Sequence, residues 1–110
     1  MTPTNYQRGR TFEYRVRDDL YHKHDAVYVM RAAQSKGLAD LIALFPRDTN
    51  AHNVWLVQCK TGTAKMPLAE RFALADMARE CGAIAMLAQP GPRNRGVTYT
   101  HLYNEEDLNV

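Results

Sequence analysis

The chain has 110 residues, of which 45% are hydrophobic and 24% are charged, and its formal net charge is +2. This length and composition predict one soluble globular domain over residues 1–110, and the small net charge alone does not indicate an anionic partner. No apolar run approaches the roughly 18–20 residues of a membrane span, and the first ten residues, MTPTNYQRGR, lack the apolar core of a secretory signal. We therefore expect no membrane partner and a cytoplasmic location.

Patterns of apolar and turn-forming residues predict two long helices, five strands and a short terminal helix. In chain order they are a helix at 5–23, strands at 27–31, 39–45 and 54–61, a helix at 67–81, strands at 83–89 and 96–103, and a short terminal helix after 104. The first helix carries one buried stripe of Phe12, Val16 and Leu20, and the second begins at Pro67 and ends at Gly82. The order αβββαββ predicts a small α/β domain, in which a three-strand meander precedes a βαβ crossover.

The third predicted strand divides its side chains between two faces, because side chains alternate along a strand. Val57 and Cys59 are expected to pack under a helix, while Gln58 and Lys60 lie on the opposite face at the end of the strand. Asp40 is the only charged residue of the preceding strand. If the two strands pair through the intervening turn, Asp40 converges with Gln58 and Lys60 on one face.

Glu13 borders the buried stripe of the first helix, so its carboxylate is expected to reach the same place. The carboxylates of Asp40 and Glu13 suit Mg²⁺, and the Gln58 amide carbonyl and the Cys59 backbone carbonyl can add neutral ligands. A metal bound there would lower the pKa of a water molecule. Lys60 would orient that water or stabilise negative charge on a phosphate. The set therefore predicts metal-assisted hydrolysis of a phosphodiester.

Basic residues gather in three regions and predict contacts with a nucleic-acid backbone if these regions share one face. The candidates for DNA binding are Arg8 and Arg10 in the first helix, Arg31 and Lys36 around the loop after the first strand, and Arg93 and Arg95 in the turn-rich loop. Arg15 and Arg17 add to the basic character of the first helix. Asp18 and Asp19 are expected on a solvated face of that helix.

Several segments resemble a known nuclease superfamily. Asp40 followed by Gln58-Cys59-Lys60 on the next strand resembles the PD-(D/E)xK pattern, and within that superfamily the chain is most similar to the archaeal-type Holliday junction resolvases, which also occur in phages. The segments that carry the likeness are RGRTFEYRV, VMRAAQSKGLADLIAL, LVQCKTG and RFALADMARECGAIAMLA, within residues 8–103. The resemblance implies a restriction-endonuclease-like core, with helices flanking a central five-stranded mixed sheet.

The resemblance also implies an activity and a set of residue roles. It implies a homodimeric endonuclease that uses Mg²⁺, with Mn²⁺ able to substitute, to nick two opposing strands of a four-way DNA junction and leave 5′-phosphates. The implied roles are metal ligation by Glu13, Asp40 and Gln58, a catalytic ammonium at Lys60, catalysis or DNA contact by Ser35, and DNA contact by Arg10 and Arg31.

Two positions depart from the family pattern. Gln58 stands where the family usually has a second acidic residue, so the site has one negative charge fewer and we expect weaker Mg²⁺ affinity than a Glu would give. Ala39 stands where the superfamily's name has Pro, at a position that varies. Two alternatives stay open: a VRR-type or other DNA repair or restriction-like nuclease of the same superfamily, and a non-catalytic DNA-binding module.

The second helix gives a separate indication of a homodimer, because its apolar residues fall on two sides. One stripe contains Leu68, Phe72, Ala75 and Ala78, and the other contains Ala73, Leu74, Met77 and Cys81. A helix that is apolar on two sides needs two partners. One partner would be the sheet, and the other would be either a symmetry mate or the C-terminal segment.

Overall fold

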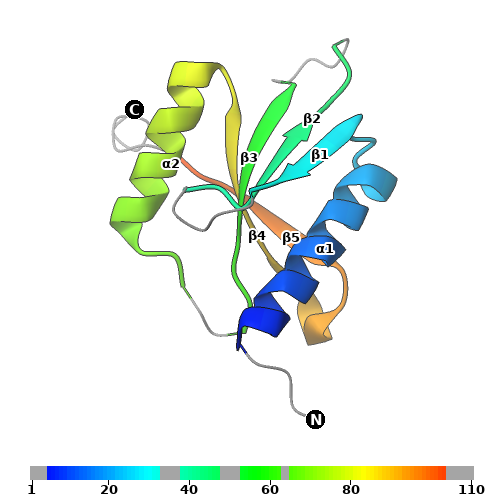
Figure 1. Ribbon diagram of the computed structural model, residues 1–110. Coiled ribbons are helices and arrows are strands. Elements are labelled where there is room, and N and C mark those ends of the chain that lie inside the picture. Colours follow the sequence, from blue (N-terminus) through cyan, green and yellow to red (C-terminus); the bar gives the residue numbers. More distant parts are fainter. Residues whose placement is uncertain (1–4, 33–37, 48–52, 63–64, 104–110) are drawn as a thin grey trace.

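A five-stranded mixed sheet with one helix on each face forms the fold (Figure 1). The computed structural model describes residues 5–32, 38–47, 53–62 and 65–103. Its elements are α1 (Asn5–Lys23), β1 (Tyr28–Arg31), β2 (Leu41–Leu44), β3 (Val54–Cys59), α2 (Leu68–Cys81), β4 (Ile84–Pro90), the 3₁₀ turn η1 (Pro92–Asn94) and β5 (Val97–His101). The predicted α/β class is confirmed, and the short helix expected after 104 lies outside the described residues. Neither described helix is long and apolar enough to cross a membrane.

The strands lie side by side in the order β1-β2-β3-β4-β5. β1, β2 and β3 pair antiparallel, with Met30 opposite Ile42 and Leu41 opposite Val57. β3 and β4 are parallel and are connected through α2, and β5 returns antiparallel to β4. The predicted meander followed by a βαβ crossover is therefore confirmed.

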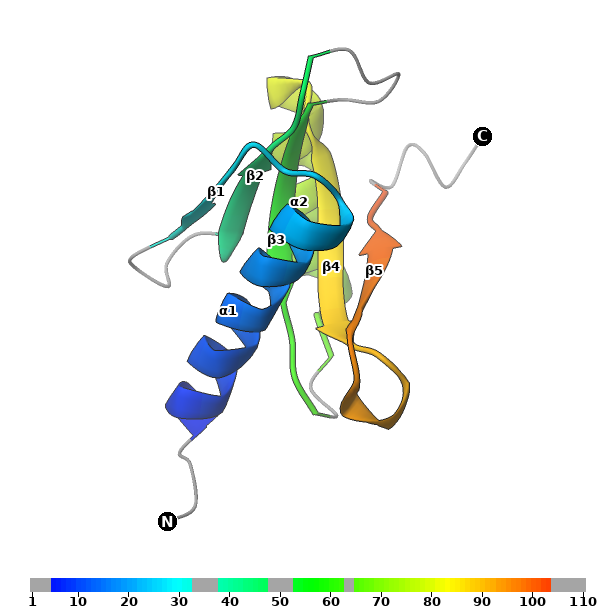
Figure 2. The same ribbon diagram turned by 90° about the vertical axis from the view of Figure 1, so that its right-hand side faces the viewer.

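α1 covers one face of the sheet through the stripe that its sequence predicts (Figure 2). Phe12 is 4% exposed, and Val16 and Leu20 are fully buried. These three side chains belong to one apolar cluster with Leu41 of β2 and Val57 of β3. Full burial of a side chain of this size stabilises a fold by about 1.5–3 kcal/mol, so the stripe holds α1 firmly over the centre of the sheet.

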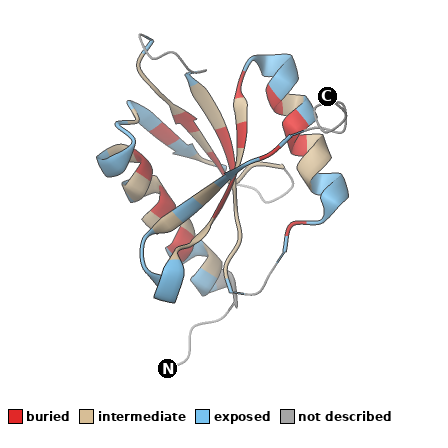
Figure 3. Ribbon diagram, turned by 180° about the vertical axis from the view of Figure 1, so that it is seen from behind, coloured by how far each residue is buried: buried red, intermediate tan, exposed pale blue. Residues whose placement is uncertain are grey.

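α2 covers the opposite face, but the prediction of two apolar stripes on this helix is wrong. Its buried residues are Leu74, Ala75 and Ala78, whereas Leu68 is 62% exposed and Cys81 is exposed. The buried side combines members of both predicted stripes, because residues three or four positions apart share one helix face. In Figure 3 the buried parts of both helices face the sheet. α2 therefore gives no separate indication of a second partner.

The boundaries of the elements fall within two residues of the predictions. Gly82 ends α2 in the left-handed conformation, with φ of 68°. The larger differences are at β2, which begins at Leu41, and at β3, which ends at Cys59. Where these two strand ends meet, the side chain of Asp40 accepts the Cys59 N–H, while the Asp40 N–H still donates to the Val57 carbonyl.

Candidate functional site

Asp40 lies directly before β2 and is held by strands on both sides. Its N–H donates to the Val57 carbonyl at 2.8 Å, and its own carbonyl accepts the Ala32 N–H at 2.8 Å. Its side-chain Oδ2 accepts the Cys59 N–H, also at 2.8 Å. These bonds to both flanking strands fix the carboxylate at the end of β3.

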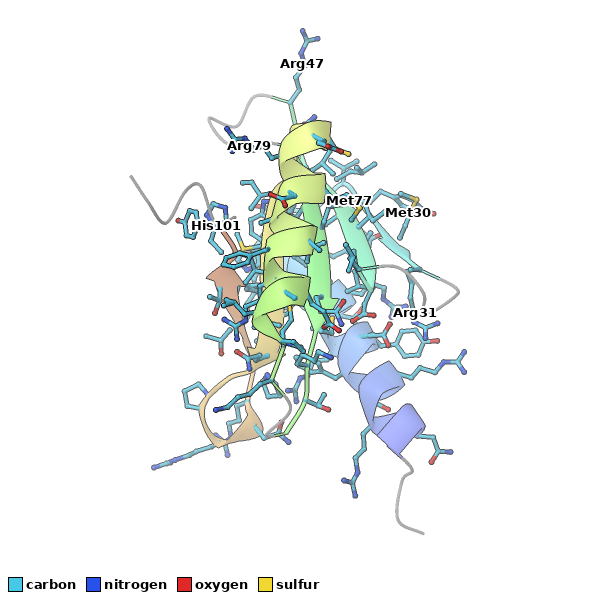
Figure 4. All side chains as sticks on the ribbon, turned by 90° about the vertical axis from the view of Figure 1, so that its left-hand side faces the viewer. Met30, Arg31, Arg47, Met77, Arg79 and His101 are labelled. Atoms are coloured by element: carbon cyan, nitrogen blue, oxygen red, sulfur yellow. The ribbon has the colours of Figure 1, made fainter. Side chains whose placement is uncertain are left out.

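Glu13 brings a second carboxylate from α1. It follows the buried Phe12, and its side chain is only 17% exposed. Arg31, the last residue of β1, donates from Nε to Glu13 Oε1 at 3.2 Å (Figure 4). Burial raises the pKa of Glu13 and the negative charge of Asp40 raises it further, while Arg31 acts in the opposite direction. The carboxylate of Glu13 on α1 is therefore close enough to that of Asp40, just before β2, for their negative charges to repel each other.

Lys60 supplies positive charge on the other side of Asp40. It follows β3 directly, and its N–H donates to the Ala88 carbonyl at 3.0 Å, so its side chain leaves a fixed backbone. Burial raises the pKa of Asp40, against the hydrogen bond from Cys59 and then the charges of Lys60 and Arg31. Lys60 thus acts on Asp40 through its charge.

Cys59 contributes its backbone to the site, and its thiol is unreactive. Burial raises the pKa of the thiol, and the negative charges of Asp40 and Glu13 raise it further. The raised pKa favours the protonated thiol at neutral pH, which is a poor nucleophile. The ligand role of its backbone carbonyl stays a prediction.

Gln58 is the predicted ligand that the structure does not join to the others. By strand alternation its side chain lies on the same side of the sheet as that of Lys60 and as Asp40, which the register places opposite Gln58. Its amide makes no hydrogen bond to either carboxylate within the part of the chain that the structure describes. Charge thus links Asp40 to Glu13 and to Lys60, and the convergence of these residues with Gln58 on one site stays a prediction.

Three arginines surround Tyr14, a residue that the sequence analysis does not single out. Arg10 Nε donates to the Tyr14 hydroxyl at 3.1 Å, and the guanidinium carbons of Arg17 and Arg31 lie 4.8 Å and 5.3 Å from the ring centroid. The hydrogen bond from Arg10 is the main cause that lowers the pKa of Tyr14. The signal is present in the sequence, because Tyr14 stands four residues after Arg10 and three before Arg17, on one helix face.

The other predicted DNA-binding residues are only partly described. Arg8, Arg93 and Arg95 are exposed, and their side chains have no hydrogen-bond or ion-pair partner among the described residues. Figures 1 and 2 place the N-terminal half of α1 and the β4–β5 turn at the same end of the molecule. Ser35 and Lys36 lie outside the described residues.

The chemistry of the carboxylates fits a divalent cation. Glu13 and Asp40 are half-buried, both have raised pKa values and the charge of Asp40 acts on Glu13, so a cation bound to both would relieve an unfavourable arrangement. Within the described ranges, no three His, Cys, Asp or Glu side chains are grouped so that they could hold a metal ion. The predicted side-chain ligands likewise include only two carboxylates, those of Glu13 and Asp40, because the third ligand is the amide of Gln58.

Glu13, Asp40 and Lys60 are the residues on which a functional proposal rests. They come from α1, from the residue before β2 and from the residue after β3, and charge links Asp40 to each of the other two. No model of a known protein family matches the chain, and no curated protein matches it either.

Proposed function

We propose that this protein is a metal-dependent, structure-specific DNA endonuclease with a restriction-endonuclease-like core, and that as a homodimer it resolves four-way junctions by paired nicking. The observation that carries the proposal is the meeting of Glu13 and Asp40 at the end of β3, where Lys60 follows. Hydrolysis of a phosphodiester needs anionic ligands for a cation and a positive group for the phosphate. Three elements far apart in the sequence supply both.

Each residue of the site has a distinct role in this proposal. Glu13 and Asp40 would hold Mg²⁺ or Mn²⁺, with Gln58 and the Cys59 backbone carbonyl as neutral ligands. The bound ion would supply positive charge and an acidified water. Lys60 would stabilise the negative charge that develops on the phosphate, because its ammonium extends from a fixed backbone position near Asp40. The products would carry a 5′-phosphate and a 3′-hydroxyl.

Arginines beside the site would hold the DNA backbone. Arg31 contacts both the Glu13 carboxylate and the Tyr14 ring, so it connects the carboxylates with the basic side of α1. Arg8 and Arg10 continue this basic surface toward the N-terminal end of the helix. Guanidinium groups suit this role because they can bind phosphate oxygens through two parallel hydrogen bonds.

Paired nicking requires two active sites, so the proposal includes a symmetric homodimer. Apolar side chains left exposed on the edge strand β1 support a contact surface of this kind: Tyr28 (52%) and Met30 (40%). Light scattering at micromolar concentration is expected to give the mass of two chains. The mass of one chain would contradict the paired mechanism.

A panel of substrates tests the proposed activity. A mobile four-way junction, a linear duplex, a flap and single strands would each be incubated with and without Mg²⁺. The enzymes compared are the wild type, Lys60→Ala and, as the matched control, Lys65→Ala at an exposed lysine nearby in the chain. We expect paired symmetric nicks in the junction only, with cutting lost in Lys60→Ala and kept in Lys65→Ala.

Each other outcome of the panel points to a different function. Cutting of the flap or the duplex in preference to the junction identifies another type of repair or restriction-like nuclease. Binding of DNA without any cutting identifies a non-catalytic DNA-binding module. Cutting that survives Lys60→Ala contradicts the role of the ammonium.

A further inference from the structure

The turn between β4 and β5, at residues 91–96, is held in a strained backbone conformation. Arg93 and Asn94 both have positive φ, 56° and 58°, a region that costs L-residues other than Gly about 1–2 kcal/mol each. The turn is closed by a hydrogen bond from the Asn94 N–H to the Gly91 carbonyl at 3.0 Å. A Cβ at Gly91 would collide with the Arg95 carbonyl. The Arg95 N–H also donates to the Pro92 carbonyl at 3.1 Å, so Arg93 and Asn94 are the two central residues of a hairpin turn with positive φ at both, as in a type I′ turn.

Arg15 of α1 supplies the contacts that fix this turn. Its Nη1 donates to the Asn94 backbone carbonyl and its Nη2 to Asn94 Oδ1, both at 3.2 Å. Its guanidinium carbon lies 4.9 Å from the centroid of the Phe12 ring. Its Nε is buried without a hydrogen-bond partner among the described residues, which costs about 1–3 kcal/mol. The guanidinium of Arg15 is thus oriented toward Asn94, while its Nε–H is left without an acceptor among the described residues.

The residues on either side of Asn94 are both exposed arginines. Arg93 and Arg95 are exposed, and neither guanidinium has a partner among the described residues. The turn begins just after Pro90 of β4, and Ala88, two residues earlier, pairs with Cys59 at the end of β3. The turn therefore lies at the same end of the sheet as the candidate site (Figures 1 and 2). The exposed guanidinium groups of Arg93 and Arg95 thus lie at the same end of the sheet as Asp40 and Lys60.

We propose that Arg15 is a positioning residue, which locks the β4–β5 turn so that Arg93 and Arg95 form a preorganised binding site for the phosphates of a nucleic-acid backbone. The identity of this ligand rests on the proposed function. Preorganisation matters because ordering a long side chain on binding costs about 0.5–1.5 kcal/mol. A turn that is already fixed avoids the additional cost of ordering its backbone. The contacts of Arg15 with Asn94 add to the hairpin's own hydrogen bonds in fixing this turn.

Binding of a labelled four-way junction, measured by fluorescence anisotropy in EDTA at several salt concentrations, tests this inference without cleavage. Arg93→Gln/Arg95→Gln is expected to weaken binding at least tenfold and to lower the salt slope by close to 2, because each phosphate contact contributes about 0.9. Arg15→Lys and Asn94→Gly alter the lock but not these two charges. Arg47→Gln, at the opposite end of the molecule (Figure 4), is the matched control.

The two lock variants distinguish positioning from general stabilisation. Arg15→Lys is expected to weaken binding several-fold and Asn94→Gly to weaken it less, because the Asn94 backbone carbonyl still accepts from Arg15. The combination should bind no more weakly than Arg15→Lys alone. In the Arg93→Gln/Arg95→Gln background, Arg15→Lys should have no further effect on affinity. Asn94→Gly keeps a residue that tolerates positive φ, so it tests the lock even if Arg15→Lys folds poorly.

Two results would overturn the inference. If Arg93→Gln/Arg95→Gln binds as Arg47→Gln does, the turn is no phosphate site. If both lock variants bind like the wild type, Arg15 does not position it. A wild type that binds junctions in EDTA but cuts none with Mg²⁺ would reject the proposed nuclease and leave this inference standing, whereas a wild type that binds no DNA would reject both.

Discussion

The carboxylates of Glu13 and Asp40 determine what the site can do. Burial raises the pKa of both groups, and the charge of Asp40 adds to the effect on Glu13. Arg31 and Lys60 offset part of this repulsion without removing it. A third carboxylate would increase the negative charge available to a cation, and Gln58 stands where the nuclease pattern has one.

Replacing Gln58 with Glu is therefore expected to strengthen Mg²⁺ binding. Because an added anionic ligand favours a divalent cation, the Mg²⁺ concentration that gives half-maximal cleavage should fall, by about tenfold for each 1.4 kcal/mol gained. The measurement is a Mg²⁺ titration of junction cleavage. Gln7→Glu, on the exposed first turns of α1, adds the same charge away from the site and should have little effect. No change in Gln58→Glu would count against Gln58 as a ligand.

The burial of Asp19 is a feature that the sequence analysis predicts wrongly. The sequence predicts a solvated side chain, but it is only 8% exposed. The Tyr99 hydroxyl donates to Asp19 Oδ2 at 2.8 Å, and His24 Nε2 lies 3.6 Å from the same oxygen. The partner on β5 is far along the chain, so no local pattern reveals it. This contact ties the end of α1 to the edge strand.

Tyr99→Phe is expected to destabilise the fold by about 1–3 kcal/mol at neutral pH, because it leaves the buried Asp19 carboxylate without its donor. Phe keeps the ring contacts with Trp55 and His24. Urea unfolding of the wild type and the variant measures this difference. A variant as stable as the wild type would show that the contact contributes nothing.

The hydrogen bond between Tyr99 and Asp19 also predicts that the stability of the fold depends on pH. Burial, then the hydrogen bond to Asp19, raises the pKa of Tyr99 in the folded protein. The neutral phenol is therefore favoured by folding, so its contribution is complete below the ordinary tyrosine pKa of about 10 and is lost as the pH rises above it. The wild type should lose stability more steeply than Tyr99→Phe between about pH 9 and 11. Parallel curves would contradict this assignment.

At the scale of elements, apolar spacing predicts α1 well and α2 less well. Phe12, Val16 and Leu20 are the one apolar row of α1, so the buried side is unambiguous. In α2, Ala and Leu occupy several sides, and only the packed sheet decides that Leu74 is covered and Leu68 is not. The candidate site follows the same rule. Strand ends predict the place of Asp40, whereas its bond to the Cys59 N–H depends on how β2 and β3 pair.

Two leucines of α2 test this assignment of its faces. Leu74→Ala should cost about 2–5 kcal/mol, because it leaves a cavity in a fully buried position. Leu68→Ala should change stability by no more than about 0.5 kcal/mol. Urea unfolding at low protein concentration compares the two, and equal losses would contradict the observed packing. A loss in Leu68→Ala that grows with protein concentration would place Leu68 in the contact between two copies.

At the scale of the whole molecule, the helices cover opposite faces of the sheet and leave one end to the site. β3 and β4 both finish there, with Cys59 paired to Ala88, and the N-terminal half of α1 and the β4–β5 turn lie at the same end (Figure 2). This arrangement places carboxylates near the end of β3 and arginines on the flanking elements. A DNA backbone could thus contact the arginines while one phosphate meets Glu13, Asp40 and Lys60.

Cleavage of a labelled four-way junction by the wild type and by Asp40→Asn, at one fixed Mg²⁺ concentration, tests the central claim most directly. Asn keeps the size of the side chain and can still accept the Cys59 N–H, so the fold should be retained while the negative charge is lost. We predict paired nicks with 5′-phosphates from the wild type, and a rate at least about a hundredfold lower, roughly 2.7 kcal/mol of transition-state stabilisation, in the variant. Equal rates for the two proteins, or no junction cleavage by the wild type, would contradict the proposal.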